Sequence, residues 1–124
     1  MTTYNENIPI LPSLARTATV TGDDIKNLLS RGLHLIIDVT SITSTPSVVP
    51  KIQGKDPVSG KYYDLLTGAA ITATGTTVLK LFPSATASAN VAVNDFLPSV
   101  FRVVMTHANS NSITYSISAN MLKA

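Results

Sequence analysis

Two histidines and seven carboxylates are the side chains of this sequence best suited to acid–base or metal chemistry. His34 and His107 stand alone. Neither belongs to an H-E-x-x-H metal motif, and the sequence has no G-x-S-x-G nucleophile motif, glycine-rich phosphate loop or calcium-binding loop. Isolated histidines are much more often surface or hydrogen-bonded groups than ligands. We therefore predict no catalytic residues, no cofactor, no metal site and no enzymatic activity.

The carboxylates are dispersed along the chain. Asp23 and Asp24 form the only adjacent pair, in a segment that suits a turn or a helix start, so capping or solvent exposure is favoured over weak cation binding. Asp38 stands inside an apolar strand and needs a partner if it is buried. Arg31 and Arg102 are the candidates, and a structural ion pair is expected. The full set is Glu6, Asp23, Asp24, Asp38, Asp56, Asp64 and Asp95.

The basic residues form no run, although the net charge is +2 and the pI is about 9.0. Only Lys51, Lys55 and Lys61 could gather, near one turn, where a solvated loop is expected and where these lysines are candidates for partner binding. Tight nucleic-acid binding needs several clustered phosphate contacts, so no specific nucleic acid is expected as partner. Tyr62 and Tyr63 place one ring on each face of a strand, and the absence of tryptophan disfavours carbohydrate stacking.

Length and composition indicate one globular domain. The 124 residues are 44% hydrophobic but only 13% charged, against about 25% in typical soluble domains. A surface of small neutral polar groups is cheap to desolvate and suits a protein that sits against neighbours. Without cysteine, disulfides and thiolate metal sites are excluded. The first residues lack signal-peptide features and no apolar run approaches about 20 residues, so a soluble protein made in the cytoplasm, with no membrane contact, is expected.

Period-two alternation is the strongest structural signal. It predicts strands over 14–21, 31–41, 48–54, 61–66, 76–82, 99–107 and 113–121, separated by turn residues. One helical turn or a structured loop is expected over 21–30, and a loop with room for a short helix over 84–94. Pro50 argues for a sheet edge or a bulge, because proline lacks the ladder N–H. The buried face is predicted to hold Leu33, Leu35, Ile37, Val39, Leu79, Leu81, Phe101, Val103, Ile113, Tyr115 and Ile117.

The fold class that follows is all-β: a single-domain antiparallel β-sandwich or small barrel of seven to eight short strands. Residues 14–124 form this domain, and residues 1–13 are expected to be an extended N-terminal arm. Pro9 and Pro12 are expected to keep the arm out of a regular ladder. Its apolar residues Ile8, Ile10 and Leu11 need cover from the arm's own domain or from a neighbouring subunit. We predict docking on a neighbour, so that deleting residues 1–12 leaves the melting temperature nearly unchanged.

Three segments together resemble a family of small tailed-bacteriophage virion structural proteins. They are RGLHLIIDVTSIT, IQGKDPVSGKYYDLL and ITATGTTVLKLFP, and the resemblance runs from about Ala15 to Met121. IQGKDPVSGKYY is its most specific part, whereas Pro50 departs from the ordinary strand residue expected there. The resemblance supplies no catalytic residues.

What the resemblance implies is a non-enzymatic virion protein, made in the host bacterial cytoplasm and carried in the virion. A head decoration (cement) protein that binds and stabilises the assembled capsid is the favoured role. Its partners would be the major capsid protein or other virion subunits, and it would form a homo-oligomer or a symmetric array on the particle. The alternatives are a tail, neck or fibre component, or a carbohydrate-binding β-sandwich used in host adsorption.

Overall fold

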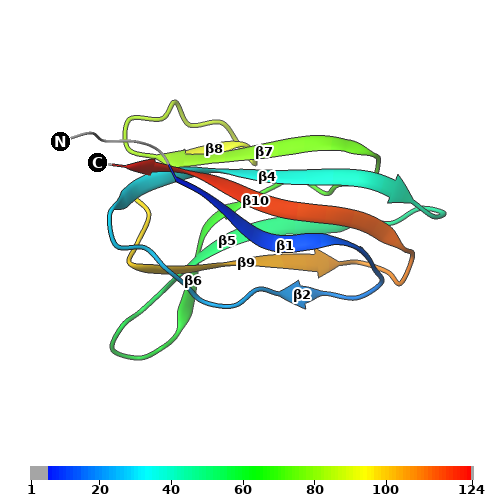
Figure 1. Cartoon of the computed structure of the whole chain (residues 1–124), viewed down its shortest axis with the longest axis horizontal. Coiled ribbons are helices and arrows are strands. Elements are labelled where there is room, and N and C mark those ends of the chain that lie inside the picture. The colour runs from blue at the N-terminus through cyan, green and yellow to red at the C-terminus, as the bar shows by residue number, and fades with distance from the viewer. Residues whose placement is uncertain (1–5, 124) are drawn as a thin grey trace.

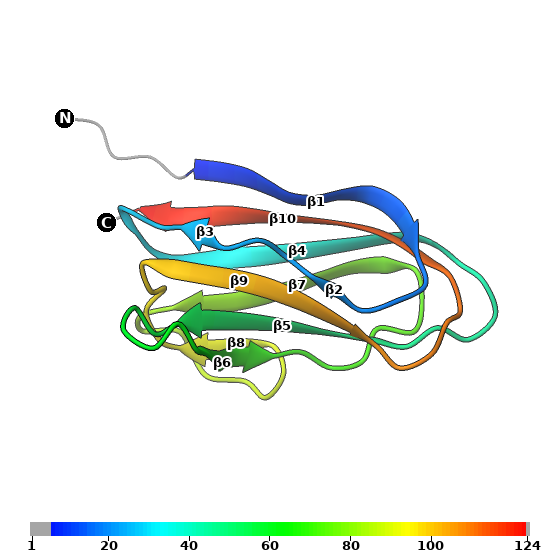
Figure 2. The same cartoon turned by 90° about the horizontal axis from the view of Figure 1, so that it is seen from below.

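The computed structural model describes residues 6–123, which form two β-sheets packed face to face (Figures 1 and 2). Sheet A has the spatial order β1 (Glu6–Arg16), β10 (Ile113–Lys123), β4 (Ser30–Ile42), β7 (Gly75–Phe82) and β8 (Ala92–Asn94). Sheet B has the order β2 (Val20–Thr21), β9 (Val100–His107), β5 (Val48–Lys55) and β6 (Tyr62–Thr67), with β3 (Ile25–Lys26) also paired to β9. Of the two architectures that the strand pattern left open, the structure has the sandwich.

The predicted all-β class is confirmed. Among residues 6–123, seven strands have six residues or more, and β2, β3 and β8 have two or three. All pairings are antiparallel except that of β7 with β8, which is parallel. The segment 84–94 contains the short strand β8 in place of a helix, and 21–30 contains β3 in place of a helical turn. No stretch of residues 6–123 forms a helix that could cross a membrane.

The hydrophobic core lies between the sheets, where the inward residues of each strand meet. All eleven side chains predicted for the buried face are at most 2% exposed, which confirms the alternation pattern. Paired residues of neighbouring strands point to the same face of a sheet, so Ile117 of β10, Ile37 of β4 and Thr77 of β7 all face the other sheet. Further side chains complete the core, mainly from sheet B and the end of β10: Val48, Ile52, Leu97, Met105, Ala119 and Met121.

The expectation that residues 1–13 stay out of a ladder is wrong for the described part. Residues from Glu6 onward pair with β10, from Glu6 opposite Met121 to Arg16 opposite Ile113. The register shifts between Pro9 and Leu11 and again between Leu11 and Leu14. Proline is tolerated here because β1 is the edge strand of sheet A and is bulged near both prolines. A domain boundary at residue 13 therefore falls inside β1, whereas residues 1–5 lie outside the described residues.

Pro50 does not mark a sheet edge, since β5 lies between β9 and β6. Its carbonyl accepts a hydrogen bond from Gly68 N–H at 2.8 Å, just beyond the end of β6. The N and C=O of one strand residue face the same side, so the missing N–H faces a position where the β6 ladder has already ended. Gly68 leaves room for the ring, because a Cβ there would lie 2.7 Å from Pro50 Cγ.

Replacing Ile117 with alanine should destabilise the domain, because this side chain is 1% exposed at the centre of sheet A. We expect a loss of about 2–5 kcal/mol in the free energy of unfolding, measured by urea denaturation. Ile36→Ala is the matched control, since Ile36 lies on the outer face of β4 and is only half-buried. Equal losses for the two variants would contradict the assignment of inner and outer faces.

Candidate functional site

Within residues 6–123 the structure brings no three histidine or acidic side chains together as a metal site. His34 is exposed on the outer face of β4, where its ring centroid lies 6.2 Å from that of Phe82. The predicted absence of catalysis, cofactor and metal stays a prediction.

A buried arginine fastens β1 to β10. Arg16 is 8% exposed, and its guanidinium donates to the main-chain carbonyls of Tyr115 (2.5 Å), Leu14 (3.1 Å) and Pro12 (2.6 Å). It also lies 4.5 Å from the centroid of the Tyr115 ring. No carboxylate of residues 6–123 pairs with it. Three carbonyl oxygens and one aromatic face satisfy the buried cation, and they hold the bulged part of β1 in place.

His107 completes this cluster. Its Nε2 lies 3.0 Å from the Tyr115 hydroxyl. Burial lowers the pKa of His107, and the nearby Arg16 charge lowers it further. Burial raises the pKa of Tyr115 to about 12. Tyr115 is fully buried and cannot touch a substrate, so the geometry fits a structural role for the three residues.

The outer face of sheet B carries a chain of polar contacts, which we call the polar face. It consists of Asp24, Lys51, Gln53, Lys55, Tyr62, Asp64 and Arg102. Arg102 Nε donates to Gln53 (2.9 Å), whose amide nitrogen donates to Asp64 (2.9 Å). The Arg102 guanidinium also lies 3.3 Å from the Tyr62 ring centroid. The Tyr62 ring is thus covered on one face by a cation and is not open there for stacking.

Asp24 ends this chain of contacts at the loop between β2 and β3. It accepts hydrogen bonds from Lys55 Nζ (2.8 Å) and the Tyr62 hydroxyl (2.6 Å). These two bonds, the one from Lys55 first, lower the pKa of Asp24. The contacts span 31 and 38 residues of sequence, so no local motif could have indicated them.

The three lysines proposed for partner binding do not form a free basic cluster. Lys51 pairs with Asp64 at 3.4 Å, and Lys55 pairs with Asp24. Lys61 is exposed at the end of the β5–β6 turn. Two of the three lysine charges are thus already matched by carboxylates, so the three lysines do not form one basic patch.

The ion pair expected for Asp38 is absent. Its carboxylate is half-buried on the outer face of sheet A, where the Thr76 hydroxyl donates to it at 3.3 Å. Arg102 lies on the outer face of sheet B, on the opposite side of the sandwich. Arg31 is seven residues away along the same strand, about 23 Å at 3.3 Å per residue. Because Asp38 reaches solvent, it needs no cationic partner.

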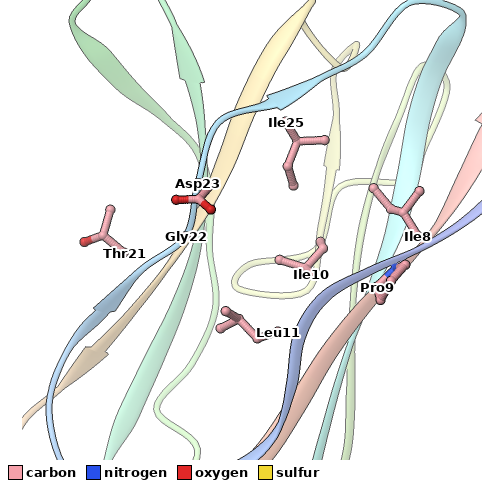
Figure 3. A pocket seen from close by; sticks show the side chains of 8 residues that line it. All are labelled: Ile8, Pro9, Ile10, Leu11, Thr21, Gly22, Asp23 and Ile25. Carbon is pink, nitrogen blue, oxygen red and sulfur yellow. The ribbon is translucent and has the colours of Figure 1, made fainter.

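Two adjoining hollows form an elongated groove between β1, at the edge of sheet A, and the β2–β3 segment, at the neighbouring edge of sheet B. We call it the edge groove. The larger hollow is about 480 Å³ and is lined by Ile8, Pro9, Ile10, Leu11, Thr21, Gly22, Asp23 and Ile25 (Figure 3). The second is about 270 Å³ and is lined by Glu6, Ile8, Ile25, Lys26, Asn27, Leu28, Leu29, Met121 and Lys123. Ile8 and Ile25 line both hollows, so the two hollows adjoin at these side chains.

The edge groove contains all three apolar residues of the predicted arm. Ile8, Ile10 and Leu11 are half-buried, and they pack against the core of their own domain. The structure therefore contradicts an arm that leaves its domain to dock on a neighbour, at least from residue 6 onward. What it leaves available is the groove that these side chains line.

A buried asparagine orders the turn at one end of the groove. The Asn27 amide nitrogen lies 2.7, 3.1 and 3.2 Å from the carbonyl oxygens of Ser30, Leu97 and Pro98, and its oxygen accepts from Ser30 N–H at 2.9 Å. This side chain ties the β3–β4 turn to the β8–β9 loop. Large apolar side chains stand out from both segments: Leu28 is 87%, Leu29 69% and Phe96 62% exposed.

No protein-family model matches the chain, and no match is found among curated proteins.

The stability of the domain should fall as the pH is lowered from 7.5 to 5.5, because of His107. Its folded-state pKa is depressed below the ordinary 6.5, so the unfolded chain takes up the proton first as the pH falls through that value. The contribution of His107 to the free energy of unfolding is therefore fully present above pH 7.5. It decreases as the pH falls through 6.5 and stops decreasing below the folded-state pKa of His107. Chemical denaturation at several pH values measures the slope. His107→Gln should flatten it, whereas His34→Gln should not, and an unchanged slope in His107→Gln would refute the assignment.

Deleting residues 1–12 should destabilise the domain, in contrast to the behaviour expected of a free arm. The deletion removes three half-buried aliphatic side chains and the Pro12 carbonyl that Arg16 binds. We expect a loss of about 2–4 kcal/mol in the free energy of unfolding, from half-burial of three aliphatic groups. Deleting residues 1–5 keeps β1 complete and is the control. If the variant that lacks residues 1–12 has the same free energy of unfolding as the full-length protein, β1 does not contribute to the core.

Proposed function

We propose that the protein is a non-enzymatic structural protein of a tailed-bacteriophage virion, and that it decorates the assembled head. It binds the outside of the capsid and adds contact area where capsid subunits meet. The proposal starts from the resemblance carried by IQGKDPVSGKYY, and the shape of that segment supports it.

The segment forms a rigid hairpin that projects from sheet B (Figure 1). The Asp56 carboxylate accepts hydrogen bonds from Val58 N–H (2.9 Å) and the Ser59 hydroxyl (2.8 Å). Gly60 adopts a φ of 76°, a left-handed conformation that favours glycine. Val58 stands at the tip, 94% exposed. An ordered turn that offers an apolar side chain to solvent suits a contact with another protein, because little conformational entropy is lost on binding.

The hairpin between β5 and β6 lies at the same end of the sandwich as two other connections, the β3–β4 turn and the β8–β9 loop (Figures 1 and 2). We call these three connections the loop end. Each presents a large exposed apolar side chain: Leu28, Val58 and Phe96. Exposed apolar groups gathered on ordered loops are typical of protein contact surfaces. This gathering is the observation that carries the proposal, and the loop end is the surface we assign to the capsid.

A carbohydrate-binding role receives less support from the geometry. Sugar stacking needs an open aromatic face, and the Tyr62 ring is covered by Arg102 at 3.3 Å. Tyr63 is 44% exposed, and no other aromatic ring of residues 6–123 packs against it. Tail, neck and fibre positions share the chemistry of the head position and are separated from it by location alone.

The decisive experiment locates the protein on particles of the phage that encodes it. Particles lacking the protein are incubated with the purified chain, sedimented, and imaged by electron microscopy. We expect added density on the outside of the head. Val58→Asp should reduce retention at least tenfold, because a charge at the tip opposes desolvation. Ser110→Asp places the same charge at the opposite end of the sandwich and should not reduce it.

Each other outcome decides against part of the proposal. Density on the tail, neck or fibres would replace head decoration by one of those roles. Equal retention of both aspartate variants would show that the loop end is not the contact. The absence of bound protein on any part of the particle would refute the virion role.

A further inference from the structure

In the edge groove, half-buried apolar side chains that pack against the core reach the surface between the two sheets. Figure 3 shows Ile10 of β1 and Ile25 of the β2–β3 segment on opposite walls of the larger hollow. We propose that two copies of this chain associate through the edge groove, related by a two-fold axis that crosses it near Ile25. The inference concerns the isolated protein and does not depend on where, or whether, it binds a phage particle.

Main-chain pairing is not the way the second copy binds. β1 is an edge strand, and such strands can add a further strand through their free N–H and C=O groups. Pro9 and Pro12 lack N–H groups, and two register shifts make β1 irregular at these positions. An additional strand would find no continuous row of donors. The groove must therefore be covered by side chains of its partner.

The charges along the groove favour a second copy over a partner of one charge sign. Glu6 and Lys123 form an ion pair at 3.2 Å. Asp23 lines the larger hollow and Lys26 the smaller one, and both are exposed. Neither forms an ion pair with any residue of 6–123. The four charges sum to zero, which offers nothing to a strongly acidic or basic partner.

A two-fold axis turns these unmatched charges into complementary ones. Asp23 and Lys26 lie on opposite sides of Ile25 along the groove. Turning one copy end for end places Asp23 of each copy opposite Lys26 of the other, which gives two ion pairs around the apolar strip. Isologous contacts of this kind are the commonest form of homodimer.

The size of the face fits a weak dimer. The part of β1 that lines the groove runs from residue 6 to residue 11, about 20 Å at 3.3 Å per residue. Two sheet edges about 10 Å apart, with their flanking side chains, give a strip about 20 Å wide. The pair of copies then buries about 800 Å², the size of a weak contact, so the dimer should form only at high protein concentration. The exposed Leu29 borders the smaller hollow and adds to the apolar part of the contact.

The test uses the full chain and reversals of the two exposed charges, which leave the core untouched. Sedimentation equilibrium at low salt, up to about 200 μM, should detect a monomer–dimer equilibrium. Asp23→Lys and Lys26→Asp should each weaken the dimer at least tenfold, because each places like charges opposite each other. An equimolar mixture of the two variants should restore the dimer. The double variant D23K/K26D should also restore it, because the pattern is reversed but still complementary.

Several results would overturn the inference. A protein that stays monomeric at the highest concentration has no such interface. A dimer that tolerates both single reversals uses another face, and oligomers larger than a dimer are not closed by one two-fold axis. A monomer whose groove becomes protected from hydrogen exchange only on phage particles would assign the groove to another virion protein. That last result would refute the dimer and leave the proposed decoration role intact. A dimer that fails to bind particles would support the dimer and refute the decoration role.

Discussion

The pairing of β10 with β4 is the interaction on which the rest of the sandwich depends. Its ladder runs from Ile113 opposite Ile42 to Lys123 opposite Ser30, the full length of sheet A. β10 also carries β1 on its other side, so the C-terminal strand lies between the first strand and the fourth. The inward residues of this pair form one wall of the core. Because residues 113–123 pair with residues 6–16 and 30–42, these contacts are far apart in sequence, and such non-local contacts slow folding.

Alternation in the sequence predicts the long strands and their inner faces because side-chain period and strand geometry are directly linked. The strand expected over 113–121 forms as Ile113–Lys123, and every predicted core side chain is buried. Alternation cannot tell which strands neighbour one another, so the partners of Asp24 and the short parallel strand β8 had no signal. The prolines of β1 gave a misleading signal, since edge position and bulges remove the requirement for their N–H groups.

The buried polar side chains find their hydrogen-bond partners in small clusters, mostly among main-chain carbonyl groups. Arg16 is held by carbonyl oxygens and Asn27 by the backbone of two loops, so each buried polar group fixes a connection between segments far apart in sequence. On the polar face, Lys51 and Lys55 are matched by carboxylates. With few charges in the sequence and a net charge of only +2, long-range electrostatics contribute little to partner choice. Partner choice then depends mainly on shape and apolar contact, and the loop end and the edge groove are the surfaces that offer both.

The edge groove and the prolines of β1 are two consequences of one geometric problem. A sandwich has open edges, where its core approaches solvent and its end strands could recruit further strands without limit. Pro9 and Pro12 block strand addition at β1, and Arg16 keeps the irregular strand attached despite the lost ladder bonds. What remains at this edge is an apolar hollow bordered by balanced charges, which side chains can fill but a continuing sheet cannot. Such an edge permits a closed contact of defined size and excludes open-ended growth, a property that an ordered assembly of identical subunits requires.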